Sequence, residues 1–185
     1  DHGVPSWDPA RHLHLTFNYW KALTSGSENW WLETLNVAPF YPPFFHLSLL
    51  PWVWLFGFTL DNAIWANTVY IIIILLSTFG IGQILYDRRT GLVAACIVSF
   101  CPALMNLTRF YLISTLLIMV VTLTYYLFLK SECFENKKYS LLFGLAYGFG
   151  LMVKWTFFLY TLPAILIGLW GKELTFRERA IQGFY

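Results

Sequence analysis

The sequence predicts an all-α, polytopic membrane protein in which transmembrane helices follow an outer-face loop of juxtamembrane helices. Hydrophobic residues make up 58% of the chain and charged residues only 12%, which is about half the charged share of an ordinary soluble domain. Aromatic residues reach 20% and include nine tryptophans, an excess that is typical of lipid–water interfaces. The net charge of +2 is too small to indicate nucleic acid as a partner. The lipid bilayer is therefore the first predicted partner.

Residues 1–60 are predicted to form an extracytoplasmic loop with juxtamembrane helices. A helix is expected to begin at Asp8, because Asp is a favoured N-cap residue and Pro9 suits the first helical position. Residues 43–58 form an apolar run that is short for a span and is interrupted by Pro51. We expect a juxtamembrane or re-entrant helix there, and a short span is the alternative.

Apolar runs divide residues 61–170 into predicted transmembrane helices. The expected ranges are about 62–85, 92–108, 110–129, 139–154 and 156–170. The apolar stretch 139–170 is too long for one crossing, so a hairpin is expected with its turn near Lys154. Residues 171–185 are expected to form an amphipathic end on the cytoplasmic side.

The distribution of basic residues predicts the orientation. Eight of the twelve Lys and Arg residues fall in the loops at 86–91, 130–138 and 171–180. The positive-inside rule makes these loops cytoplasmic if residues 43–58 do not cross. The other four basic residues, which then lie on the outer side or at its membrane edge, are Arg11, Lys21, Arg109 and Lys154. Charges at such positions are costly and often functional, and an anion is their expected ligand.

Several ionisable side chains are candidates for a site on this outer face. Asp8 is either a helix cap or a member of this site, and Arg11 and His12, one turn further along, either pair with it or orient it. His46 either reaches toward lipid headgroups or joins the same site. Arg109 either anchors the end of a span or binds phosphate, for which its fork of donors is well suited. Lys154 has the same two interpretations.

Five short motifs then occur in order along the chain. They are Trp7-Asp8-Pro9-Ala10-Arg11-His12-Leu13, Tyr41-Pro42-Pro43-Phe44-Phe45-His46-Leu47, the stretch from Gly91 to Pro102, Thr108-Arg109-Phe110-Tyr111-Leu112, and the stretch from Gly148 to Thr156. The ordered set resembles family 39 glycosyltransferases, the group of dolichyl-phosphate-mannose–protein mannosyltransferases and bacterial aminoarabinose transferases, which have the GT-C membrane fold. Since relatives are longer and the chain does not begin with Met, we expect an incomplete, N-terminal part of such a protein.

The resemblance implies inverting transfer of a mannose-like sugar, or another hexose or pentose, from a polyprenyl-phosphate donor to a hydroxyl of a protein or glycolipid. By this resemblance Asp8 is the catalytic base, and Arg109 and Lys154 bind the donor phosphate. The supporting residues are Arg11, His12, Tyr41 and His46. No cofactor and no metal ligand is predicted, and a divalent metal is left open. The chain departs from many relatives at Tyr41, where they have His, and at Ser114, where they have an acidic residue.

The expected location is an integral, multi-pass position in a bacterial plasma membrane, or in the endoplasmic reticulum membrane of a eukaryote, with the site on the extracytoplasmic face. Two alternatives stay open. One is a non-catalytic membrane protein that binds lipid-linked phosphates, and the other is part of a transporter.

Overall fold

The computed structural model describes residues 7–38 and 41–182, with side chains described for 8–38 and 41–170. The described residues form ten α-helices and no strand, which confirms the predicted all-α class. The helices are α1 (Trp7–Thr24), α2 (Trp30–Asn36), α3 (Phe44–Phe56), α4 (Leu60–Trp65), α5 (Asn67–Leu85), α6 (Arg88–Ser99), α7 (Pro102–Leu107), α8 (Ile113–Lys130), α9 (Lys137–Val153) and α10 (Phe157–Gln182).

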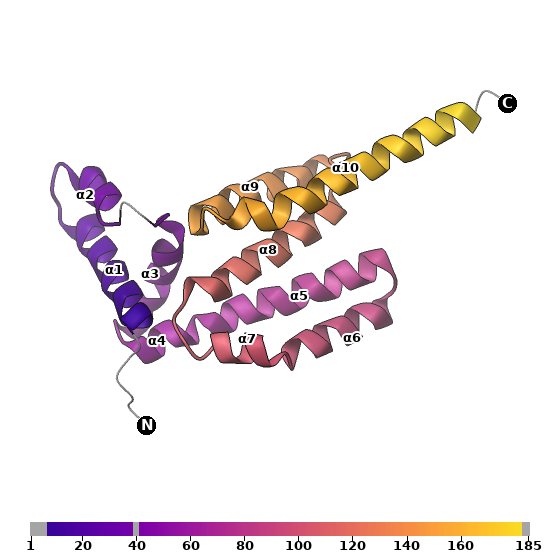
Figure 1. The fold of residues 1–185 in the computed structure, drawn as a ribbon. Coiled ribbons are helices and arrows are strands. Elements are labelled where there is room, and N and C mark those ends of the chain that lie inside the picture. The colour runs from indigo at the N-terminus through magenta and orange to yellow at the C-terminus, as the bar shows by residue number, and fades with distance from the viewer. Residues whose placement is uncertain (1–6, 39–40, 183–185) are drawn as a thin grey trace.

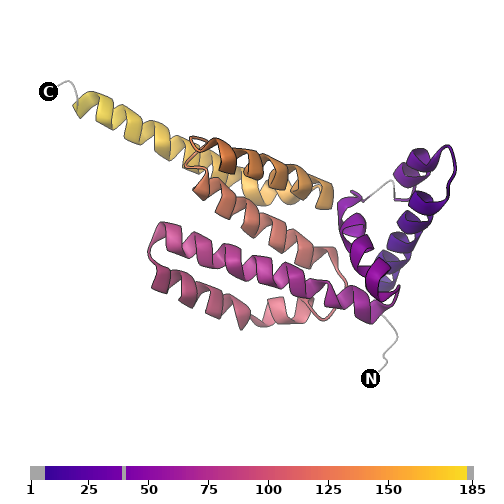
Figure 2. The same cartoon turned by 180° about the vertical axis from the view of Figure 1, so that it is seen from behind.

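Helices α1–α4 gather at one end of a bundle that α5–α10 form (Figure 1). Within the bundle α5 packs between α6 and α8, and α9 and α10 pack on the other side of α8. The turns between α7 and α8 and between α9 and α10 lie at the end nearest α1 and α3, whereas the α5–α6 and α8–α9 turns lie at the far end (Figures 1 and 2). The alternating helices therefore bring three distant segments of the chain to one end of the bundle.

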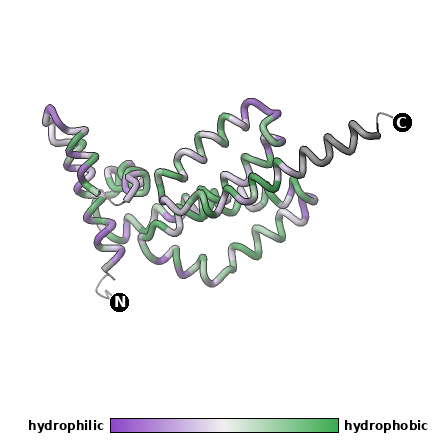
Figure 3. The backbone as a smooth tube through the Cα atoms, turned by 45° about the horizontal axis from the view of Figure 1, so that its top comes forward, coloured by the Kyte–Doolittle hydropathy of each residue, from purple (hydrophilic) through white to green (hydrophobic). Residues whose placement is uncertain are grey.

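Two helical segments are long and apolar enough to cross a bilayer, Leu60–Leu85 and Ile113–Lys130. Two shorter apolar helices are Phe44–Phe56 and Phe157–Trp170. Hydrophobic residues run along the bundle helices, while hydrophilic residues concentrate in α1, α2 and the turns (Figure 3). This pattern is that of an integral membrane protein. The five crossings and their orientation stay predictions.

The structure corrects two sequence predictions about helix boundaries. Residues 92–108 do not form one helix, because α6 ends at Ser99 and α7 begins at Pro102. Proline lacks a backbone N–H and disfavours helical geometry in the residue before it, and Cys101 is accordingly extended. Helix α1 begins at Trp7, so Asp8 lies in the first helical turn and is not the N-cap.

A pair of glycines lets α5 and α6 approach until their backbones touch. A Cβ atom added to Gly91 would lie 2.5 Å from the carbonyl oxygen of Phe79 and 3.0 Å from the backbone nitrogen of Gln83. A Cβ atom on Gly82 would lie 2.6 Å from the Cα atom of Gly91. Membrane helices commonly use small residues for such close contacts. Since the atoms that a side chain would meet belong to the backbone, they cannot move aside cheaply.

Replacing Gly91 with Ala is therefore expected to destabilise the protein by about 1–3 kcal/mol, the usual cost of overpacking. Thermal unfolding of the purified full-length protein in detergent micelles measures the change. The matched control is Gly144→Ala, because a Cβ atom there meets no heavy atom within 4 Å. Equal melting temperatures for the two variants would contradict the close contact.

Candidate functional site

Helix α1 presents Asp8 and His12 on one face, one helical turn apart. Asp8 lies in the first turn, where the positive end of the helix dipole favours a carboxylate. Its side chain is 65% exposed, and its Oδ1 atom lies 3.9 Å from Nε2 of His12. The carboxylate is therefore open to solvent on one side and faces an imidazole on the other.

His12 is buried where α1 packs on α3. Its Nδ1 atom lies 3.2 Å from Nε2 of His46, within hydrogen-bond distance. The ring of His46 stacks on that of Tyr19, with 5.4 Å between ring centroids, and Phe45 and Tyr41 meet the His12 ring edge-on. Burial lowers the pKa of His12 below its ordinary value and lowers the pKa of His46 to about 3, with a further contribution from the charge of His12. Both imidazoles are therefore neutral at pH 7.

Arg11 and Tyr41 flank this histidine pair. Arg11 is exposed, and its guanidinium lies over the Tyr41 ring, 5.7 Å from the centroid. Such a cation–π contact contributes about 0.5–1 kcal/mol at an exposed site. The Tyr41 ring thus contacts both Arg11 and His12.

A hydrogen-bond chain connects α1 to the segment that follows Arg109. The hydroxyl of Thr16 donates to the backbone carbonyl of His12 at 3.0 Å and lies 3.1 Å from the hydroxyl of Tyr111. A hydroxyl has one proton to donate, so Tyr111 donates to Thr16. Both side chains are buried, and the chain fixes the start of α8 against α1.

Arg109 lies on the turn between α7 and α8 and is exposed. The side-chain amide of Asn67, on α5, donates to the carbonyl oxygens of Thr108 and Phe110, at 3.0 Å each. These two carbonyls flank Arg109, so a buried amide holds the turn that carries the cation. Arg109 borders a cavity of about 280 Å³ whose other lining residues are Ile71, Ser99, Leu104, Met105 and Thr108.

Lys154 lies just after α9, where its extended backbone ends the helix, and its side chain is exposed. The stacking of Phe44 on Phe149, with 4.7 Å between ring centroids, places this end of α9 against α3. Lys154 borders a cavity of about 300 Å³ whose other lining residues are Ser114, Leu117, Ile118, Val121, Thr122 and Tyr160. A cation beside a largely apolar cavity between membrane helices is suited to an amphipathic anion.

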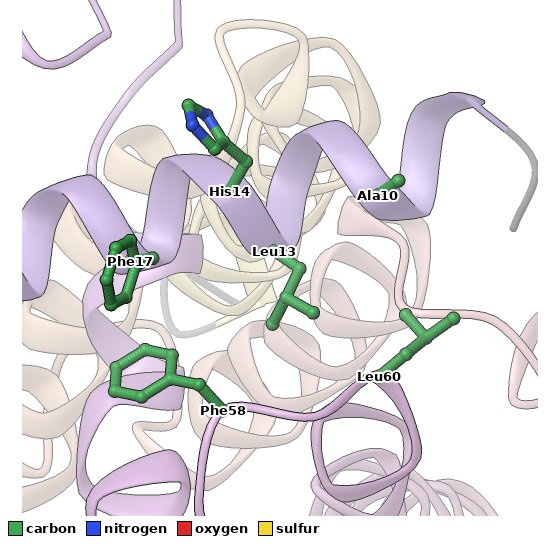
Figure 4. A pocket seen from close by; sticks show the side chains of 6 residues that line it. All are labelled: Ala10, Leu13, His14, Phe17, Phe58 and Leu60. Carbon is green, nitrogen blue, oxygen red and sulfur yellow. The ribbon is translucent and has the colours of Figure 1, made fainter.

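A further groove runs along a different face of α1. Figure 4 shows Leu13 and Phe17 of α1 opposite Phe58 and Leu60. The groove has a volume of about 370 Å³, and Ala10 and His14 complete its lining. The Nδ1 atom of His14 lies 3.4 Å from Nδ2 of Asn18. Because His14 is exposed, it is not part of the buried His12–His46 pair.

The family model described as dolichyl-phosphate-mannose-protein mannosyltransferase matches residues 41–183, most of the chain. The chain belongs to this family. The expected resemblance to GT-C glycosyltransferases is thus confirmed, and the family is one of membrane glycosyltransferases of the mannosyltransferase type. No curated protein and no solved structure matches the chain.

The site residues predicted from the sequence differ in two respects: whether they lie in the family-matched range, and whether the structure brings them together. The matched range contains Tyr41, His46, Arg109 and Lys154, and it leaves out Asp8, Arg11 and His12. The structure brings five candidates together, namely Asp8, Arg11, His12, Tyr41 and His46. The α7–α8 turn, which contains Arg109, and the α9–α10 turn, which contains Lys154, lie at the same end of the bundle (Figure 1), and each of these residues borders a cavity of its own. Among the described residues, no group of three His, Cys, Asp or Glu side chains is placed to hold a metal ion.

Sequence reasoning missed several residues that shape this candidate site. Thr16 and Tyr19 follow His12 at intervals of four and seven residues, the spacing of one helix face, and this periodicity was a usable signal. Asn67 is a single amide at the start of an apolar run, where an unpartnered polar group would be costly. That cost was the available signal that Asn67 holds another segment.

Proposed function

We propose that this membrane glycosyltransferase moves a sugar from a polyprenyl-phosphate donor to an acceptor hydroxyl at the extracytoplasmic face, with inversion. The description of the matching family names a dolichyl-phosphate mannose donor and a protein acceptor, and a glycolipid acceptor is kept as an alternative. One observation carries the proposal. An exposed carboxylate and two exposed cations lie at one end of a bundle of apolar helices, where a lipid chain can stay in the bilayer while its phosphate and sugar reach polar groups.

In the proposed reaction Asp8 takes the proton from the acceptor hydroxyl. The acceptor oxygen then forms a bond to the anomeric carbon on the face opposite the phosphate. The bond between that carbon and the phosphate oxygen breaks, and the electron pair leaves with the lipid phosphate. Arg109 and Lys154 stabilise the negative charge that develops on this leaving group, which is the step where fixed cations accelerate a transfer most.

The test uses the purified full-length protein in lipid vesicles, with radiolabelled dolichyl-phosphate mannose as donor and a Ser/Thr-containing peptide as acceptor. We expect transfer from the lipid donor, no transfer from a soluble sugar nucleotide, and a product whose anomeric configuration is opposite to that of the donor. A protein that binds the lipid phosphate without turnover would overturn the proposal in favour of a non-catalytic binding protein. Movement of the intact donor across the vesicle membrane would indicate a transporter.

Replacing Lys154 with Gln is expected to raise the KM for the lipid donor roughly tenfold or more, because a hydrogen bond to a charged group contributes about 1.5–3 kcal/mol. Arg109→Gln is expected to act in the same direction. Initial rates at varied donor concentration measure the effect.

The matched control for both cations is Lys21→Gln. Lys21 is exposed near the end of α1, and its ammonium lies over the ring of Phe17, 4.7 Å from the centroid. It borders neither of the two cavities. A KM in the Lys154 and Arg109 variants equal to that of Lys21→Gln would exclude the proposed phosphate contacts.

A further inference from the structure

Two buried histidines lie next to Asp8: His12 faces its carboxylate, and His46 contacts His12. His12 is 3% exposed and His46 is fully buried. The contacts run from Oδ1 of Asp8 to Nε2 of His12, 3.9 Å away, and from Nδ1 of His12 to Nε2 of His46, 3.2 Å away. Burying an imidazole is costly unless its nitrogen atoms have partners, so the arrangement of the two rings needs an explanation beyond packing.

The positions of the ring protons follow from the surroundings. If His12 donated to His46, the unprotonated Nε2 of His12 would face the carboxylate of Asp8. The Nδ1–H of His46 would then be buried, although this atom has no hydrogen-bond partner among the described residues. If His46 donates, the Nε2–H of His12 faces Asp8, and only an acceptor lone pair stays unpaired. Buried orphan donors are rarer than under-satisfied acceptors, so both histidines have the proton on Nε2.

The surroundings also keep the two rings uncharged. Burial is the largest influence on the pKa of His12 and lowers it; the charge of Asp8 opposes burial by raising this pKa, and the charge of Arg11 lowers it further. The aromatic rings that contact the pair belong to Tyr19, Tyr41, Phe45 and Tyr111. A neutral His12 can offer an N–H to the carboxylate of Asp8 without placing a positive charge beside it.

We propose that His12 and His46 are positioning residues for Asp8. His46 fixes the tautomer of His12, and the Nε2–H of His12 orients the carboxylate after a small rotation of the exposed Asp8 side chain. The inference deepens the proposed function and rests on Asp8 acting as the base. His12 lies on α1, and the residue that fixes its tautomer, His46, lies on α3, within the family-matched range.

Two substitutions of His46 separate positioning from packing. His46→Gln keeps an N–H donor near the position of Nε2, while His46→Phe fills the space of the ring without a donor. We expect His46→Phe to lower kcat for mannose transfer roughly 10–100-fold with little change in KM, since small misplacements of reacting groups have effects of this size. His46→Gln is expected to recover most of the loss. If His46 only fills space in an apolar core, Phe would serve better than Gln, and this order would overturn the inference.

The control for the histidine substitutions is His14→Phe, an exposed position on the same helix, which should leave kcat unchanged. A double substitution tests whether His46 acts through Asp8. In an Asp8→Asn background, His46→Phe should cause no further loss of transfer. A further loss would show that His46 acts independently of Asp8 and would overturn the inference.

The outcomes also separate this inference from the proposed function. Full activity in Asp8→Asn would overturn the proposed role of Asp8, and with it the inference. Loss of activity in Asp8→Asn with equal activity in wild type, His46→Phe and His46→Gln would overturn the inference alone. The ¹⁵N NMR spectrum of the imidazoles in the full-length protein tests the inference without measuring catalytic activity. Two neutral rings protonated on Nε2 at pH 7 are expected, and a proton on Nδ1 of either ring would contradict the proposal.

Discussion

Replacing Asp8 with Asn is expected to lower sugar transfer by roughly 10²–10⁴-fold, the usual contribution of a general base, with the fold and donor binding intact. Asparagine has nearly the same shape but cannot take a proton from the acceptor hydroxyl. The Asp8 side chain is 65% exposed, so its replacement removes little packing. Loss of a negative charge from the first helical turn costs only about 0.3–1 kcal/mol. The effect should therefore appear in kcat.

The matched control for this prediction is Asp61→Asn. Asp61 is also an exposed carboxylate in the first turn of a helix, α4, and α4 packs against α1. Both variants should show wild-type melting temperatures, and only Asp8→Asn should lose transfer. Unchanged transfer in Asp8→Asn would remove Asp8 from the mechanism. If the wild-type protein binds the lipid phosphate without turnover and Asp8→Asn binds it equally well, the chain is a binding protein.

The helices were largely predictable because apolar runs and charged turns are local properties of the sequence. The structure places α8 at Ile113–Lys130, where residues 110–129 were expected, and the chain turns between α9 and α10 at residues 154–156, close to the expected turn at Lys154. The break before Pro102 was a local signal of the same kind. The prediction of one helix over residues 92–108 followed the length of the apolar run and gave too little weight to Pro102. Proline restricts the backbone of the residue before it wherever it occurs.

The candidate site was predictable only where its residues share a helix. The spacing of Asp8 and His12 follows from helical periodicity, and their contact follows from the sequence alone. The hydrogen bond between His12 and His46 joins α1 to α3, and nothing local in the sequence specifies how these two helices cross. The same limit applies to Asn67, whose two acceptors lie on a turn 41 and 43 residues further along the chain.

Replacing Asn67 with Leu is expected to destabilise the protein by about 1–3 kcal/mol and to raise the KM for the lipid donor. Asn67 is 1% exposed, and its Nδ2 atom donates to the carbonyl oxygens of Thr108 and Phe110. Leucine has a similar shape and leaves no large cavity, but both carbonyls lose this donor. Each buried polar group without a partner costs about 1–3 kcal/mol. The Oδ1 atom of Asn67 is buried and has no partner among the described residues, so its removal recovers part of this cost.

The loss of stability and the rise in donor KM expected for Asn67→Leu have separate origins, and two measurements distinguish them. Thermal unfolding in detergent reports the lost hydrogen bonds, whereas the donor KM reports the turn that carries Arg109. The matched control is Thr68→Leu, the neighbouring exposed position on α5, which introduces the same side chain and should change neither quantity. A lowered melting temperature with an unchanged KM would mean that Asn67 stabilises the bundle without positioning Arg109. Equal melting temperatures for Asn67→Leu and Thr68→Leu would exclude both roles, because a buried amide that holds two carbonyls cannot be replaced without loss.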